Sequence, residues 1–246
     1  MRVGICLSGV PRWLYRTDFI NKIATKYDTY LFLFHWKSNQ YENLKTHSFI
    51  SRPADPDFNP EIYKLPALKH FESSSLVFED IVTELQSQYD RCPKEKQGVK
   101  NLAPYSMCYA IKEANKLREQ YEINNNFKFD LVMKCRFETY FFKESGINSD
   151  FDFSKYDLNY LWKPMMWCDR KYDMNDCFAF SNSENMSHYS RIYDNLYELS
   201  LIEHMHPETV FYHHNKHLTI RSTGLVGGCG IEGHGWHAFD ESKIII

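Results

Sequence analysis

The sequence predicts an α/β fold with a mostly parallel central sheet flanked by helices. Short apolar runs with the alternation of strands recur along the 246 residues. Stretches with helical periodicity separate them, which is the order expected of parallel strands joined by crossover helices. A chain of this length fits one domain, so residues 1–246 are treated as a single unit.

The first three elements are a strand, a helix and a strand. The N-terminal run RVGICL is apolar and ends in the turn signal Ser8–Gly9. The next stretch, VPRWLYRTDFINKIATKY, has a helical face around Ile20, and Thr17 or Asp18 is placed to cap it. Residues 29–36, TYLFLFHW, form a second apolar run. This order predicts a parallel pair of strands.

Residues 37–104 form a variable region that six prolines punctuate. Within it, ALKHFES favours a strand and LVFEDIVTELQSQY favours a helix. The next stretch, YSMCYAIKEANKLREQYE, has the clearest helical stripe of the chain, from Met107 to Tyr121. Ser106 is its expected N-cap.

The stretch DLVMKCRFETYFF, residues 130–142, has strand periodicity that separates two faces. Lys134, Arg136 and Glu138 follow one another on one face. The other face is apolar and holds Phe129, Leu131, Met133, Cys135 and Phe137. Charges inside a covered sheet are costly unless something pairs with them. They predict either a structural ion-pair network or a site for a diphosphate and a divalent metal, since ligands bind at the carboxyl ends of parallel strands.

The remaining segments complete the predicted sheet. LNYLWKP, DCFAFS and LTIRSTG favour strands. Ser181 and Glu184 have the spacing of a capping box for a helix that runs to about Leu199, and Pro207 is a good first residue for the helix PETVFYHHNKH. Residues 224–246 form a tail that holds six of the ten glycines, which predicts a loop able to close over a ligand as a lid.

Composition argues against a nucleic-acid or membrane partner. The net charge is −3, from 29 basic and 32 acidic residues, which is too balanced for nonspecific binding to DNA or to an anionic membrane. No apolar run reaches the ~18 residues of a membrane span. The seven cysteines form no CxxC pair, so we expect them to be reduced and the protein to be cytoplasmic.

Three further segments carry candidate chemistry. In SGVPRW, backbone N–H groups near Gly9 and the Arg12 guanidinium could receive a phosphate, or form an ordinary turn. In DRKYDMND, a carboxylate could orient a sugar hydroxyl, or the loop could simply be solvated. Its aspartates are Asp169, Asp173 and Asp176. Seven of eleven histidines fall between residues 204 and 237, in no spacing typical of zinc sites.

Six short stretches resemble, in order, a group of glycosyltransferase-like proteins of bacteria and large viruses or phages. They are CLSGVPR (6–12), LFHW (33–36), YSMCYAIKEANKL (105–117), KCRFE (134–138), DCFAFSNSENM (176–186) and PETVFYHHNKHL (207–218). The resemblance implies a GT-A-like (Rossmann-like) fold. It also implies transfer of a sugar from a nucleotide-diphosphate donor, with UDP- or dTDP-sugars favoured, to a glycan or another hydroxyl acceptor.

The resemblance assigns the donor to the ends of the first strand and of the strand at residues 130–142. Ser8, Gly9 and Arg12 would bind the nucleotide, and Lys134 and Arg136 would bind its diphosphate. Lys134 stands where these proteins have an arginine.

The resemblance assigns the metal and the catalytic carboxylates to three other residues. Glu138 would bind Mn²⁺ or Mg²⁺, although these proteins have an aspartate at its position. A second metal ligand could come from Asp176, His213 or His214. Asp176 and Glu208 would face the donor sugar or the acceptor. Glu208 in the first turn of its helix also has a simpler explanation, since the helix dipole favours a carboxylate there.

Three alternatives stay open at the level of sequence. SGVPRWLYRT loosely resembles the donor-binding loop GxPRSGTT of sulfotransferases, although the hydroxyl-bearing end of that loop is missing. A non-catalytic carbohydrate-binding relative would share the same motifs. A glycosyltransferase acting on hydroxymethylated DNA is a further possibility, against which the net charge argues mildly.

Overall fold

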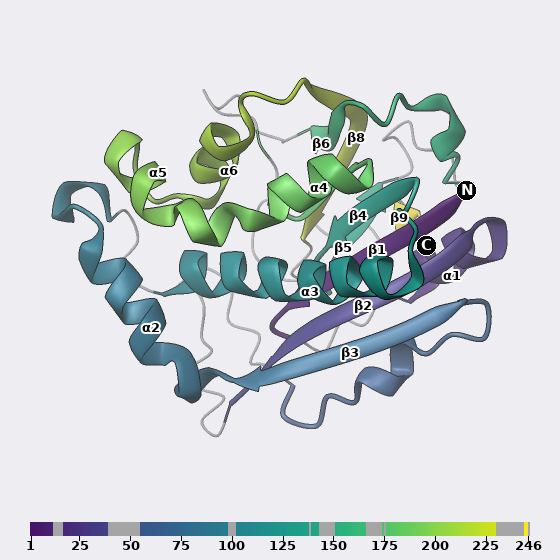
Figure 1. Ribbon diagram of the computed structural model, residues 1–246, viewed down its shortest axis with the longest axis horizontal. Coiled ribbons are helices and arrows are strands. Elements are labelled where there is room, and N and C mark those ends of the chain that lie inside the picture. The colour runs from purple at the N-terminus through teal and green to yellow at the C-terminus, as the bar shows by residue number, and fades with distance from the viewer. Residues whose placement is uncertain are drawn as a thin grey trace.

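The computed structural model describes residues 1–11, 17–38, 55–97, 102–137, 139–142, 151–165, 174, 176–229 and 244–245, with backbone alone at 140–142, 165, 224–229 and 244–245. The strands in this part of the chain form a sheet in the order β3-β2-β1-β4-β7-β6-β8-β5-β9 (Figure 1). Their bounds are β1 Arg2–Gly9, β2 Asp28–Lys37, β3 His70–Val77, β4 Leu131–Cys135, β5 Thr139–Phe142, β6 Leu161–Met165, β7 Phe178–Ser181, β8 Ile220–Cys229 and β9 Ile244–Ile245.

The central part of the sheet is parallel apart from one strand. β1 pairs parallel with β2 and with β4, and β2 pairs parallel with β3. β7 is antiparallel to both of its neighbours, β4 and β6, and β6 is again parallel to β8. β7 therefore runs against the other central strands, while β5 pairs antiparallel with β8 and β9 at the far edge. The predicted α/β class with a mostly parallel sheet is confirmed.

Helices flank this sheet. Their bounds are α1 Asp18–Lys26, α2 Phe78–Arg91, α3 Ala103–Asn125, α4 Ser183–Ser190, α5 Leu196–Ile202 and α6 Pro207–Asn215, with short 3-10 turns at Pro60–Tyr63, Lys94–Lys96, Phe153–Lys155 and Arg191–Asn195. The long helix α3 lies across the strands, and α4, α5 and α6 continue the same layer (Figure 1). No helix among the described residues is long and apolar enough to cross a membrane.

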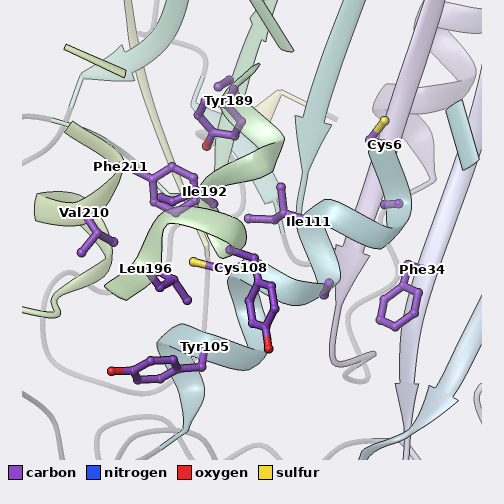
Figure 2. Packing of buried hydrophobic residues seen from close by; sticks show 14 of the residues in the cluster. Cys6, Phe34, Tyr105, Cys108, Ile111, Tyr189, Ile192, Leu196, Val210 and Phe211 are labelled. Atoms are coloured by element: carbon purple, nitrogen blue, oxygen red, sulfur yellow. The ribbon is translucent and has the colours of Figure 1, made fainter. Parts of the chain in front are cut away.

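Two apolar clusters hold the layers together, one on each face of the sheet. Alternation along β2 sends Phe32 and Phe34 into the first cluster, and Leu31 and Leu33 into the second. The first cluster joins the strands to α3, α4 and α6, and Figure 2 shows Cys108 and Ile111 of α3 facing side chains of the later helices. The second cluster packs α1 against the opposite face. Because both faces are covered, the charged residue of β4, Lys134, is enclosed.

A buried ion-pair network attaches α3 to α4. The Arg118 guanidinium is fully buried and donates to Glu122 at 2.8 Å, to Ser183 and to Ser187 at 2.7 Å. Burial alone would raise the pKa of Glu122, but the N–H of Phe129 and the nearby guanidinium lower it. Residue patterns in the sequence did not predict this network. Its spacing of four residues is common on exposed helices as well.

The predicted strand at 130–142 is interrupted. β4 ends at Cys135 and β5 begins at Thr139, with a turn between them. The apolar face is confirmed for Leu131 and Met133, which lie in the second cluster with Cys135 and Phe137. Phe129 precedes the strand and packs in the first cluster instead, so its predicted place on that face is wrong.

Both predicted N-caps that depended on serine are wrong. Helix α3 begins at Ala103, and the Ser106 hydroxyl donates to the Ala103 carbonyl within the first turn. Ser181 is the last residue of β7, and the adjacent Asn182 caps α4 by accepting from the Asn185 N–H.

Two expectations about the C-terminal region and the cysteines need correction. β8 runs to Cys229 and β9 lies at 244–245, so these parts of the predicted loop at 224–246 belong to the sheet. Cys177 is disulfide-bonded, so the expectation that every cysteine is reduced is wrong at this residue. The free, buried cysteines include Cys6 and Cys108.

Candidate functional site

The carboxyl ends of the central strands β1 and β4 lie beside the start of β7. We call this side of the sheet, where the parallel strands end, the carboxyl edge. β1 and β4 are parallel neighbours with Leu7 opposite Cys135. β7 runs the other way, with Phe178 opposite Cys135. The residues just before β7 therefore lie beside the residues just after β4. This edge brings together three predicted site residues from distant parts of the sequence: Lys134, Arg136 and Asp176.

Ser8 and Gly9 end β1 at this edge. Ser8 is buried and lies two residues beyond Cys6, the register partner of Lys134, so strand alternation places Ser8 on the face of Lys134. Gly9 has φ 134°, a backbone conformation that side chains disfavour, which explains a glycine here. The predicted partner in this loop, Arg12, lies outside the described residues.

Lys134 is enclosed beneath the helix layer. Its side chain is on the Cys108 face of β4, the residue is 1% exposed, and its ammonium donates to the backbone carbonyl of Asp176. A buried ammonium requires such partners, because desolvation would otherwise be prohibitive. The contact fixes the chain just before β7, so Lys134 supports the site by holding Asp176.

Arg136, just after β4, and Asp176, just before β7, form a partly exposed ion pair. Arg136 Nη1 lies 3.3 Å from Asp176 Oδ2, with side chains 25% and 16% exposed. The Sγ atom of Cys177 lies 3.4 Å from the other carboxylate oxygen. Because a disulfide sulfur carries no proton, that approach is a contact and not a hydrogen bond. Both charges are thus close to solvent, unlike Lys134.

Thr139 is a residue of this site that the sequence analysis missed. Its buried hydroxyl accepts from the Arg136 N–H at 2.9 Å and donates to the Cys177 carbonyl at 3.2 Å. The Thr139 N–H in turn donates to the Arg136 carbonyl at 3.1 Å. One hydroxyl therefore joins the end of β4 to the start of β7. Alternation predicts only that Thr139 belongs to a strand, and it does not indicate the contacts of the hydroxyl.

Two neutral side chains beside the charged edge are not acid–base groups at neutral pH. Burial raises the pKa of Tyr189 well above its ordinary value, and Asp176 raises it further. Burial also raises the pKa of the Cys108 thiol. Both groups stay protonated at neutral pH, so the charges at this end of the sheet are those of the Asp176 carboxylate and the Arg136 guanidinium.

Glu208 lies in a separate group of contacts on α6. Its Oε2 lies in close contact with Nδ1 of His206, the N-cap residue of the helix. Residues 216–219 join α6 to β8, which begins at Ile220 opposite Leu161 of β6.

The histidines of this region do not form a metal site within the described residues. His188 and His214 stack on each other, and His217 meets His188 edge-on. Metals bind in the plane of an imidazole, so stacked rings do not converge on one ion. No group of three potential metal-binding side chains occurs in the described part of the chain.

Three predicted residues, Glu138, Asp169 and Asp173, lie outside the described residues, so their roles stay predictions. His213 is described on α6, and its role as a second metal ligand stays a prediction as well. Compared with known proteins, the chain matches no protein-family model and no curated protein sequence.

Proposed function

We propose that the protein is a nucleotide-sugar-dependent glycosyltransferase with a GT-A-like domain. The observation that carries the proposal is the Arg136–Asp176 pair at the carboxyl edge, beside the end of β1. Ligands of open parallel sheets bind at this edge. A cation and a carboxylate held there suit a donor that has both a diphosphate and sugar hydroxyls. The mostly parallel sheet is compatible with a Rossmann-like fold.

The chemistry follows from the charges. When the bond between the anomeric carbon and the phosphate oxygen breaks, negative charge grows on the departing diphosphate. The Arg136 guanidinium would stabilise this charge through charge-assisted hydrogen bonds. Asp176 or Glu208 would accept the proton of the acceptor hydroxyl, or bind the donor sugar. Ser8 and Gly9 would contact the nucleotide, with Arg12 as a further predicted contact.

A divalent cation fits this site only in part. Mn²⁺ and Mg²⁺ prefer oxygen ligands, and Asp176 supplies one carboxylate at the edge. The predicted ligand Glu138 lies outside the described residues. When bound, such a cation would neutralise charge on the diphosphate. We therefore propose that donor binding is compared with Mn²⁺ present and with EDTA.

The test is the melting temperature of the full chain with saturating nucleotide sugars. The panel contains UDP-, dTDP- and GDP-sugars, each with Mn²⁺ and with EDTA. A ligand at 100 times its Kd should add about 2.7 kcal/mol to the free energy of unfolding. If all nucleotide sugars leave the melting temperature unchanged, the proposal fails. Stabilisation by adenosine phosphosulfate nucleotide alone would support a sulfotransferase, and by free sugars alone a carbohydrate-binding protein.

The acceptor is assayed separately once a donor is identified. We expect transfer to a glycan or another hydroxyl compound. Hydroxymethylated DNA is included as an acceptor in the same assay, because the net charge of −3 argues only against nonspecific DNA binding.

A further inference from the structure

We propose that Asp176 holds Arg136 in the ligand-free protein as a latch that the donor diphosphate must displace. The inference rests on the proposed function, because it assumes that an anionic ligand binds Arg136. In the structure the carboxylate of Asp176 occupies one side of the guanidinium, with 3.3 Å between Nη1 and Oδ2. A phosphate oxygen that binds Nη1 in the same direction would compete with this carboxylate.

The backbone around the latch is fixed from two sides. Lys134 donates to the carbonyl of Asp176, and Thr139 donates to the carbonyl of Cys177. Thr139 also accepts from the N–H of Arg136. These contacts hold the main chains of both partners, so the latch we propose opens by rotation of the Asp176 side chain and not by movement of either strand.

Electrostatics favours opening when a diphosphate arrives. A carboxylate carries one negative charge, whereas a diphosphate carries more and offers several oxygens to a planar guanidinium. Both side chains are partly exposed, at 25% and 16%, so water and ions screen their attraction and the pair is modest in strength. Once displaced, Asp176 stays within the site, where it can face the donor sugar.

The latch predicts that removing the carboxylate charge tightens anion binding. Asp176→Asn keeps the size and an acceptor oxygen but weakens the hold on Arg136. We measure Kd by calorimetry for UDP and for inorganic pyrophosphate, in EDTA, with the full chain. UDP and pyrophosphate should bind the variant about two- to fivefold more tightly than wild type, the range of a partly exposed ion pair.

A double-mutant cycle separates a latch from simple charge repulsion. In an Arg136→Gln background, Asp176→Asn should give no gain, because there is no guanidinium left to release. A gain of the same size in that background would overturn the latch. Equal or weaker binding by Asp176→Asn alone would also overturn it, provided that its melting temperature matches wild type.

The outcomes also separate this inference from the proposed function. If nucleotides bind and Asp176→Asn gives no gain, only the latch fails. If no nucleotide binds but pyrophosphate binds Asp176→Asn more tightly, the latch stands and the proposed donor is wrong. If neither ligand binds any variant, both proposals fail.

Discussion

His188 and His214 stack with ring centroids 4.4 Å apart, and each donates from Nε2 to the backbone carbonyl of the other. The distances are 3.1 Å from His188 and 2.8 Å from His214. This reciprocal arrangement joins α4 to α6, the helix that carries Glu208. It also fixes the tautomer of both rings, because only a protonated Nε2 can donate to a carbonyl.

We predict that this histidine pair makes the fold sensitive to acid. The pKa of His214 is lowered from 6.5 to about 4, chiefly by burial. The imidazoles of His188 and His217 also lower it, while the hydrogen bond to the His188 carbonyl and the charge of Asp194 raise it. Burial also lowers the pKa of His188, with Arg191 contributing. Because the folded pKa lies below the unfolded value, stability is complete above about pH 6.5 and falls toward pH 4.

The measurement is the free energy of unfolding by urea between pH 7 and pH 5. His214→Gln keeps an N–H donor but does not titrate. Near pH 5 a single histidine of this kind contributes a slope of about 1.2 kcal/mol per pH unit. The variant should therefore lose less stability than wild type over this range. Identical slopes for both proteins would show that His214 does not titrate as its burial requires.

We predict that Arg118→Met destabilises the protein by about 1.5–3 kcal/mol, because it removes the guanidinium from the buried Glu122 carboxylate, which keeps the Lys128 ammonium at 2.9 Å. Lys116→Met on the same helix is the matched control, since Lys116 is exposed and pairs only loosely with Glu113 at 3.6 Å. The control should change stability by no more than about 0.5 kcal/mol. Urea unfolding measures both, and equal effects of the two substitutions would refute a special role for Arg118.

We predict that the hydroxyl of Thr139 positions Arg136. Thr139→Val keeps the shape but leaves the Arg136 N–H and the Cys177 carbonyl without this partner, at a cost of about 1–3 kcal/mol. Thr139→Ser keeps the hydroxyl and should restore both stability and pyrophosphate affinity. Calorimetry and urea unfolding give the two quantities. Equal behaviour of the valine and serine variants would contradict the prediction.

Sequence patterns predicted the sheet well, because the alternation of residues along a strand indicates which side chains share a face of the sheet. Leu131 and Met133 lie on the expected face, and Lys134 lies on the opposite one. Alternation did not show where the strand ends. The turn after Cys135 depends on hydrogen bonds of Thr139 to Arg136 and to Cys177, and Cys177 is 38 residues away.

The site was predictable in its residue types and only partly in its contacts. The sequence identified Lys134, Arg136 and Asp176 as candidates, and the fold brings them together. It placed Lys134 inside a covered sheet but gave no indication of its partner, the carbonyl of Asp176, which is 42 residues away. The buried pair of Arg118 and Glu122 was missed because its spacing is equally common on solvated helices.

A crystal structure of the full chain with UDP shows whether a nucleotide diphosphate binds at the carboxyl ends of β1 and β4. We expect phosphate density within hydrogen-bond distance of the Arg136 guanidinium, with the carboxylate of Asp176 turned away from Nη1. We also expect the nucleoside beside Ser8 and Gly9. Ordered UDP elsewhere on the sheet, or UDP at these strand ends with the Arg136–Asp176 contact intact and no phosphate on Arg136, would refute the proposed donor site.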